Sequence, residues 1–241
     1  MELEGVGASD LAMEWRDYVL VSLLSRFPLR RKHFASMTYK EDDKAEYIPN
    51  GSNLRKLDDG GWLLYLPAKE FKNGNRNKQI FGPNGDQDVT LKLDDHKVFQ
   101  SFIPIIEEYM NKHRPVLLNG ETDGPVFPFS VDAKKDNTAD QVSRAVERWT
   151  QNYLAENSTH RNGLRIKGVQ KFNPHAFRHL VATHVIIQTG SFEPAAFLLL
   201  DSIETIQMHY GRFLPGHRMA IGLRALESVY APATSLSDGK P

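Results

Sequence analysis

The amino-acid sequence predicts a mainly α-helical protein with one small antiparallel β-sheet or hairpin, and three observations lead to this prediction. Apolar residues recur at helical spacing in successive segments of the chain. The run at residues 62–67 (WLLYLP) has the apolar character of a buried strand. No internal repeat and no long linker interrupts the pattern, so residues 1–230 are expected to form a single domain and residues 231–241 a disordered tail.

The first helices are predicted from capping residues and proline. Ser9 or Asp10 is expected to cap a helix that reaches Arg26, and Pro28 is expected to break it. The inward face of this helix is predicted to include Tyr18. Further helices are expected around Phe34 and Met37, and over residues 94–113 (with Val98 inward), 138–156, 174–188, 193–200, 203–213 and 215–230.

The sheet is predicted as a hairpin. The strand at residues 62–67 is expected to turn at Asn73-Gly74-Asn75 and to return as a weak strand over residues 79–81. Residues 114–136, with Val126-Phe127 as an apolar anchor, and residues 160–171 are expected to be loops. The coarse pattern is therefore helices around a single hairpin.

Composition excludes several classes of protein. The chain has no cysteine, which excludes a thiol nucleophile, a disulfide framework and a cysteine-based zinc site. No run of apolar residues is long enough to predict a membrane span, and acidic residues rather than a basic, apolar leader follow Met1. These features favour a cytoplasmic protein without a membrane partner.

The formal net charge is zero, with 30 basic and 30 acidic residues, but the charges are segregated. Residues 160–179 and residues 26–33 carry several Arg and Lys residues and no acid, whereas acids collect at residues 41–46 and 86–95. A neutral chain with segregated charge can present a basic face to nucleic acid. The alternative is a solvated surface on which the charges cluster by chance.

The segment at residues 174–213 carries the most informative side chains. His175, Arg178 and His179 are spaced i, i+3 and i+4, so they share one face of a helix, and Tyr210 follows in a later helix. A helix end with surface polar residues would show the same spacing. A zinc pair formed by His175 and His179 is a further alternative, but no Glu follows His175 and no third ligand is apparent. No metal or cofactor is therefore expected.

These motifs resemble the tyrosine recombinase family of the phage integrase type, and the resemblance covers most of the chain. RFPLRRKHFASMTY matches the family's segment with the first catalytic arginine, here Arg30, and WLLYLPAKEFKN matches its hairpin lysine, here Lys72. PHAFRHLVATH matches the His-x-x-Arg motif of His175 and Arg178, and DSIETIQMHYGRF supplies the nucleophile Tyr210. The resemblance implies a catalytic-domain-like fold.

Several positions depart from the family pattern. Asp201 stands where His or Trp is usual, Leu200 replaces the preceding Gly, and His33 replaces an acid. Asp201 is alternatively a helix N-cap, and His209 or His179 is a substitute donor. Lys69 and Lys78 are alternatives to the hairpin lysine. The family's N-terminal DNA-binding domain has no apparent counterpart, so the chain is interpreted as a catalytic domain alone or as a minimal recombinase.

The resemblance implies a site-specific DNA recombinase or integrase of a mobile element, which cuts and rejoins strands through a covalent 3′-phosphotyrosine. Arg30 and Arg178 would clamp the phosphate, Tyr210 would attack it, Lys72 would protonate the leaving oxygen, and His175 would donate to the phosphate or carry the tyrosine proton. The implied partners are double-stranded DNA and further copies of the chain, bound without cofactor. Backbone contacts to DNA are expected from Arg31, Lys32, Arg161, Arg165, Lys167, Lys171 and His179.

Other readings of these residues stay open. Arg30 is alternatively a surface cation of its helix, and Tyr210 is alternatively an aromatic residue packed against Phe213. At the level of the whole protein, the departures at Asp201 favour a catalytically weak or inactive DNA-binding relative. A metal hydrolase built on His175 and its neighbour one turn later is the third hypothesis.

Overall fold

The computed structural model describes residues 7–43, 51–71, 78–129 and 138–211, together with residues 216, 219, 220, 222–224 and 226. Within these residues the protein is mainly helical with small antiparallel sheets, which confirms the coarse prediction. The chain divides into two compact units, residues 1–181 and 182–241, and each is described by itself. The single domain over residues 1–230 stays a prediction, and the tail at residues 231–241 lies outside the described residues.

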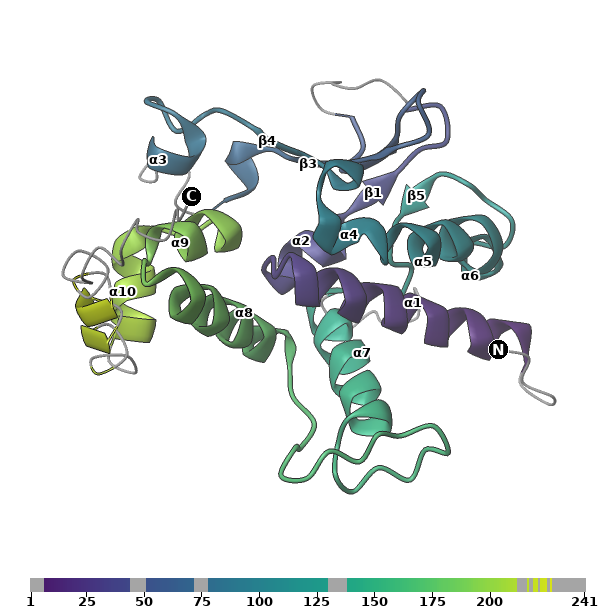
Figure 1. Cartoon of the computed structure of the whole chain (residues 1–241). Coiled ribbons are helices and arrows are strands. Elements are labelled where there is room, and N and C mark those ends of the chain that lie inside the picture. Colours follow the sequence, from purple (N-terminus) through teal and green to yellow (C-terminus); the bar gives the residue numbers. More distant parts are fainter. Residues whose placement is uncertain are drawn as a thin grey trace, which may run out of the picture. The chain divides into compact units, whose positions relative to one another are not determined.

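The first unit is built around a long N-terminal helix (Figure 1). This helix, α1, packs against α6, against the π-helical turn η4 and against α7, while α7 also packs against α2. The elements are, in chain order, α1 (Ala8–Arg26), α2 (Arg31–Ser36), β1 (Thr38–Tyr39), β2 (Leu54–Lys56), β3 (Trp62–Leu66), η1 (Ala68–Glu70), α3 (Lys78–Phe81), β4 (Val89–Lys92), η3 (Leu93–Asp95), α4 (Lys97–Gln100), α5 (Ile103–Glu108), η4 (Tyr109–His113), α6 (Arg114–Leu117), β5 (Gly124–Pro125), α7 (Thr138–Tyr153) and the N-terminal part of α8 (Pro174–Thr189).

The core of the first unit forms where α1 meets its neighbours. Leu20 and Leu24 of α1 are fully buried, as are Phe102 and Val142 from elements far away in the sequence. The loop anchor Val126-Phe127 is buried as predicted. Burial of these side chains stabilises the unit, at about 1.5–3 kcal/mol for each large aliphatic or aromatic residue.

The start of α1 differs from the prediction. The helix begins at Ala8 with Gly7 as N-cap, so Ser9 and Asp10 lie in its first turn and neither is the cap. The end near Arg26 is as predicted, since the backbone N–H of Phe27 closes the last turn and proline follows. Tyr18 is 37% exposed rather than inward. Val19 and Leu23, on the same predicted face of α1, are buried as expected.

The predicted hairpin is wrong in its second strand. Strand β3 is as predicted, but residues 78–81 form the short helix α3, and the strand that returns beside β3 is β4. The sheet has the antiparallel order β2-β3-β4, with Leu54 opposite Leu64 and Leu64 opposite Leu91. The predicted turn at residues 73–75 lies outside the described residues.

Strand β2 escaped prediction because its sequence, Leu-Arg-Lys, carries no strand signal. Arg55 is nevertheless fully buried. Its Nε donates to Ser52 O at 2.8 Å and lies 3.6 Å from the Asp43 carboxylate, and its guanidinium group covers the Tyr65 ring. These partners compensate the desolvation of the charge, so a basic side chain can be buried in this strand.

The predicted helix over residues 94–113 is broken in the structure. It consists of η3, α4, α5 and η4, and helical structure continues into α6 up to Leu117, where a loop was predicted. Pro104 lies in the first turn of α5, and a proline there starts a new helix because it lacks an N–H and clashes with the preceding turn. Val98, predicted to face inward, is 55% exposed.

The second unit contains the C-terminal part of α8 followed by α9 (Glu193–Leu199) and α10 (Ile203–Tyr210). These helices agree with the prediction to within a few residues. Their facing side chains form one apolar cluster, which consists of Ala182, Ile186, Phe192, Ala195, Ala196, Leu199, Ile206 and Tyr210. No helix among the described residues is long and apolar enough to cross a membrane.

Candidate functional site

The candidate site of the first unit is centred on the turn between α1 and α2. Phe27, Pro28 and Leu29 are buried in this turn, and Arg30 follows as the N-cap of α2 with an extended backbone (φ −70°, ψ 145°). The buried neighbours fix the backbone here. The half-buried Arg30 side chain therefore starts from a well-defined position at the N-terminus of a helix.

Arg178 reaches this turn from α8. Its side chain is buried, with the residue 6% exposed, and its Nη1 donates to the backbone carbonyl oxygen of Pro28 at 2.5 Å. The bond joins two segments 150 residues apart in the sequence, and its acceptor lies two residues before Arg30. The guanidinium group of an arginine carries five N–H donors, so one hydrogen bond to a carbonyl oxygen leaves the others available in principle for further bonds.

The two predicted histidines share one face of α8. The rings of His175 and His179 meet edge to face with their centroids 4.4 Å apart, as expected for residues one turn apart. His175 is exposed and His179 is half-buried. The side chain of Asn173 begins this helix, since its Oδ1 accepts the backbone N–H of His175 at 3.0 Å; sequence reasoning did not single out this cap.

Lys72 lies outside the described residues, but the segment that leads to it is tied to α2. The Lys32 ammonium donates to the backbone carbonyl oxygen of Glu70, and the Glu70 carboxylate lies 3.6 Å from Nδ1 of His33. The ring of Phe71 stacks on His33 with a centroid distance of 4.4 Å. The chain therefore enters residue 72 from a residue packed against the helix that Arg30 caps.

His33 is the residue in this region whose role the sequence did not reveal. It is 3% exposed, and its Nε2 is buried without a hydrogen-bond partner among the described residues. Burial lowers the pKa of His33 below its ordinary value of 6.5, the hydrogen bond to Glu70 opposes this shift, and the charge of Arg30 adds to it. An acid of another segment, Glu70, therefore lies beside the His33 ring.

Two of the basic residues assigned to DNA contact have partners within the first unit. Arg31 forms an exposed ion pair with Asp140 at 2.5 Å, and Lys171 lies 3.6 Å from the Glu147 carboxylate. Exposed pairs of this kind contribute little to stability and exchange readily for a phosphate partner. The assignment of both side chains to DNA contact stays a prediction.

The remaining basic residues of the loop at residues 160–171 divide into two groups. Arg161 and Lys167 are exposed. Arg165 instead curls over its own loop, where its guanidinium group donates to the carbonyl oxygens of Ser158 and His160 at 3.0 and 3.1 Å. Its structural role is to fix the loop, and its positive charge adds to the basic surface.

Tyr210 and Asp201 belong to the second unit. Tyr210 is the last residue of α10 and is a buried member of the apolar cluster, with 4% exposure. Asp201 is also buried, and its Oδ1 accepts the backbone N–H of Ser202 at 3.2 Å. The N-cap of α10 is Ser202, whose Oγ accepts the N–H of Thr205, so the interpretation of Asp201 as the cap is wrong.

Leu200, which stands in place of the family's usual glycine, adopts a left-handed backbone conformation (φ 49°, ψ 50°) at the end of α9. Glycine adopts this conformation without strain, whereas a residue with a Cβ is disfavoured by about 1–2 kcal/mol. The Leu200 side chain is buried, and that burial offsets the strain. The backbone geometry expected of glycine is therefore kept with a different residue.

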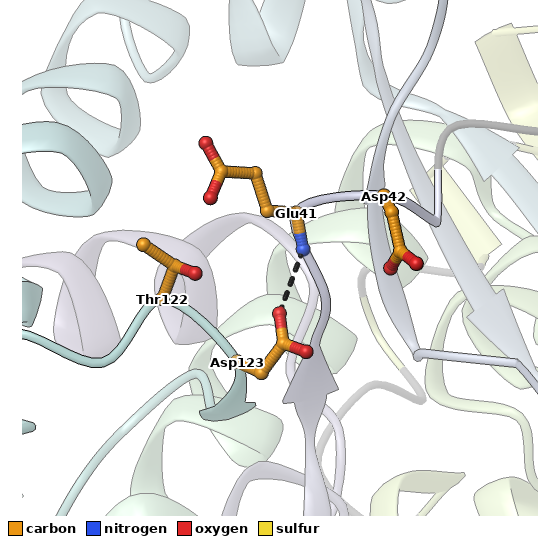
Figure 2. Close-up of a pocket in the computed structure, with 4 residues that line it drawn as sticks. All are labelled: Glu41, Asp42, Thr122 and Asp123. Atoms are coloured by element: carbon orange, nitrogen blue, oxygen red, sulfur yellow. Dashed lines mark hydrogen bonds between the residues drawn. The ribbon is translucent and has the colours of Figure 1, made fainter.

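A separate pocket of the first unit is acidic. Glu41, Asp42, Thr122 and Asp123 line it, and the backbone N–H of Glu41 donates to Asp123 Oδ1 at 3.0 Å (Figure 2). Among the described residues there is no group of three or more His, Cys, Asp or Glu side chains arranged to hold a metal ion. The acids give this pocket a negative potential, which disfavours anionic ligands.

Comparisons with known proteins give a structural neighbour only. No protein-family model matches the chain, and no curated protein matches it. Among solved structures, the chain is similar to a crystal structure of XerA recombinase, at a TM-score of 0.46 and 16% sequence identity. The aligned region covers 93% of this chain and 62% of the XerA chain, so the protein spans less than two thirds of that neighbour.

Proposed function

We propose that this protein cuts and rejoins strands of double-stranded DNA through a covalent 3′-phosphotyrosine, as a recombinase. The observation that carries the proposal is the hydrogen bond from Arg178 Nη1 to the carbonyl oxygen of Pro28. The bond ties α8 to the turn that ends at Arg30, so the Arg178 side chain reaches the backbone two residues before Arg30. The sequence placed them far apart.

The electrostatics of this region suit a phosphodiester. Arg30 is the N-cap of α2, so its backbone lies at the positive end of a helix dipole, and Arg178 supplies a second permanent positive charge. Charge that develops on the non-bridging oxygens of phosphorus would be stabilised by two permanent cations. The planar guanidinium group of each arginine can also donate two parallel hydrogen bonds to two oxygens of the phosphate.

The tether between η1 and α2 supports the role of Lys72. Lys32 and His33 hold Glu70 and Phe71 against α2, and Phe71 is the last described residue before Lys72. In the proposal Lys72 gives its proton to the leaving 5′ oxygen.

The reaction balances without metal or external energy. Tyr210 Oη gives its proton to His175 and attacks phosphorus, the bond to the 5′ oxygen breaks, and that oxygen takes a proton from Lys72. In the reverse direction a 5′-hydroxyl attacks the phosphotyrosine and releases the phenol. Because the bond energy is kept in the protein–DNA link, neither ATP nor a metal ion is consumed. Exchange between two duplexes requires several chains, so a homo-oligomer on DNA is part of the proposal.

The test is adduct formation on nicked DNA. Duplexes of randomised sequence, each with a nick that lets the 5′-hydroxyl fragment diffuse away, are incubated with the protein and separated under denaturing conditions. Wild-type protein is expected to give a covalent protein–DNA band, which Tyr210→Phe abolishes. Tyr18→Phe is the matched control and is expected to keep the band, since Tyr18 is a partly exposed residue of α1. A band that survives in Tyr210→Phe would refute the assignment.

A second candidate is DNA binding without cleavage, and the burial of Tyr210 favours it. The Tyr210 side chain is packed in an apolar cluster and is 4% exposed, so its phenol is not presented at a surface where DNA binds. Asp201, at the position of the usual His or Trp, adds a negative charge rather than a hydrogen-bond donor. In this case wild-type protein binds the duplex in a salt-dependent manner and forms no adduct, and Tyr210→Phe leaves the binding unchanged.

A further inference from the structure

A second pocket of the first unit has no part in the proposed reaction. It encloses about 340 Å³ and lies on α1 and α7, which pack against each other. Four aromatic side chains and one carboxylate line it: Glu14, Trp15, Tyr18, Trp149 and Tyr153. A pocket with this lining is rare on a protein surface, where large aromatic side chains normally pack inward.

The aromatic rings form a continuous wall. Tyr18 and Trp149 lie nearly parallel with centroids 6.2 Å apart, and Trp149 and Tyr153 lie 4.9 Å apart. Trp15 completes the wall, edge to face with Tyr18 at 6.0 Å. The faces of Trp and Tyr rings carry negative partial charge, so a wall of this kind attracts a cation.

The carboxylate of the pocket has a buried oxygen. Oε2 of Glu14 is buried and has no hydrogen-bond partner within the described part of the chain. Asp17, one turn further along α1, is held by Arg16 at 2.9 Å and also by Arg148. Both nearby arginines, Arg16 and Arg148, are therefore paired with Asp17. A buried oxygen without a hydrogen-bond donor, such as Oε2 of Glu14, is energetically costly unless a ligand supplies the donor.

The negative charge of Glu14 extends into the pocket. Burial raises the pKa of the Tyr153 phenol, and the charge of Glu14 raises it further. An adjoining pocket of about 260 Å³ shares Glu14, Trp149 and Tyr153 and adds the acids Asp10 and Asp17 together with Arg148, which is paired with Asp17. The acids of the two pockets outnumber this one cation, which is unfavourable for a phosphate backbone.

We propose that this pocket binds an arginine side chain presented by another polypeptide. A guanidinium group is planar and weakly hydrated, so it can stack on Trp149 or Tyr18 while it donates to the Glu14 carboxylate. A lysine ammonium is more strongly hydrated and gains less from the rings. Free arginine would bring its own carboxylate beside Asp10 and Asp17, whereas an arginine within a peptide has none.

The pocket is tested with small probes and fluorine NMR. The protein contains three tryptophans, of which Trp15 and Trp149 line the pocket and Trp62 is buried in β3. With 5-fluorotryptophan incorporated, N-acetyl-arginine methylamide is expected to shift the signals of Trp15 and Trp149 and to leave that of Trp62 in place. The neutral isostere N-acetyl-citrulline methylamide is expected to bind at least about tenfold more weakly, because it lacks the charge.

Variants separate the carboxylate from the aromatic wall. Glu14→Gln keeps the shape and is expected to weaken binding of the arginine probe about tenfold, while Glu121→Gln, an exposed residue outside the pocket, leaves it unchanged. Tyr153→Leu removes one ring and is expected to weaken binding as well. Circular dichroism of each variant verifies folding.

Three outcomes would overturn the proposal. Equal binding of the citrulline probe, or unchanged binding in Glu14→Gln, would show that no cation is recognised. Equal or tighter binding of free arginine would assign the pocket to a free metabolite instead of a polypeptide. Equal binding of N-acetyl-lysine methylamide would contradict the preference for guanidinium. None of these residues takes part in the proposed DNA reaction, so adduct formation by Glu14→Gln is expected to equal that of wild type.

Discussion

Arg178 is predicted to have two separable functions, and replacing it with Lys and with Ala distinguishes them. In the structure its guanidinium group is buried and donates to the Pro28 carbonyl oxygen. A hydrogen bond from a charged donor contributes about 1.5–3 kcal/mol, and Arg178→Ala also leaves the carbonyl unpaired. We therefore expect Arg178→Ala to lower the free energy of unfolding by about 2–3 kcal/mol. Arg178→Lys retains a cationic donor and is expected to cost about 1 kcal/mol.

Arg178→Lys is expected to have a large effect on adduct formation, in contrast to its small effect on stability. Lysine offers a point charge in place of the planar fork, so Arg178→Lys loses part of the phosphate clamp although it keeps most of the stability. Loss of one transition-state donor slows a reaction by about 10²–10³-fold. We expect adduct formation by Arg178→Lys to fall by about this factor, and Arg144→Lys, an exposed residue of α7, to have no effect.

Stability is measured by urea denaturation followed by tryptophan fluorescence. All three tryptophans, Trp15, Trp62 and Trp149, belong to the first unit, so the signal reports on the unit that contains Arg178. The reasoning is refuted if Arg178→Lys forms adduct at the wild-type rate while it unfolds as easily as Arg178→Ala. In that case the guanidinium group would serve only to hold the turn.

Two further predictions concern the α10 cap and a buried histidine. Ser202→Ala removes the acceptor for the N–H of Thr205 and is expected to destabilise α10 by about 1 kcal/mol. Hydrogen exchange at the Thr205 amide is then expected to be faster than in wild type. Ser202→Asp keeps a capping oxygen and is expected to keep the slow exchange. Burial depresses the pKa of His33 in the native state. Below a pH of about 6.5 the unfolded chain therefore binds a proton at His33 that the native state does not bind. The free energy of unfolding is expected to decrease as the pH falls from there to the native pKa. His113, whose pKa burial also lowers, contributes with the same sign. Urea denaturation at pH 7.5 and 5.5 is expected to show a smaller pH effect in His33→Asn; an effect equal to wild type would contradict the assignment.

The helices were largely predictable because their signal is local. In α7, Val142 and Val146 recur at helical spacing and are buried as the periodicity indicated. The helix over residues 174–188 was predicted to within one residue of α8, since Pro174 and Gly190 mark its two ends. Spacing and capping residues act over a few positions, so a sequence is sufficient to find them.

The small sheet was not predictable in the same way. Strand β4 pairs with β3 across a long excursion, and its sequence, Val-Thr-Leu-Lys, is short and mixed. Strand β2 depends on the compensation of buried Arg55 by Asp43 and Tyr65, which comes from outside the strand. Strand pairing is a non-local choice that depends on what covers each face, so propensity alone selected the wrong partner for β3.

The sequence by itself determined which side chains are present and which of them share a helix face, as the contact of the His175 and His179 rings illustrates. Only the tertiary structure decided that Arg178 bonds to the turn before Arg30 and that Glu70 faces His33. It also decided that Oε2 of Glu14 is buried beside aromatic rings, with no hydrogen-bond partner in the described segments. The physical reason is the range of the interactions. Helical spacing fixes neighbours three or four residues apart, whereas the partners of a buried charge are fixed only when distant segments pack and exclude water.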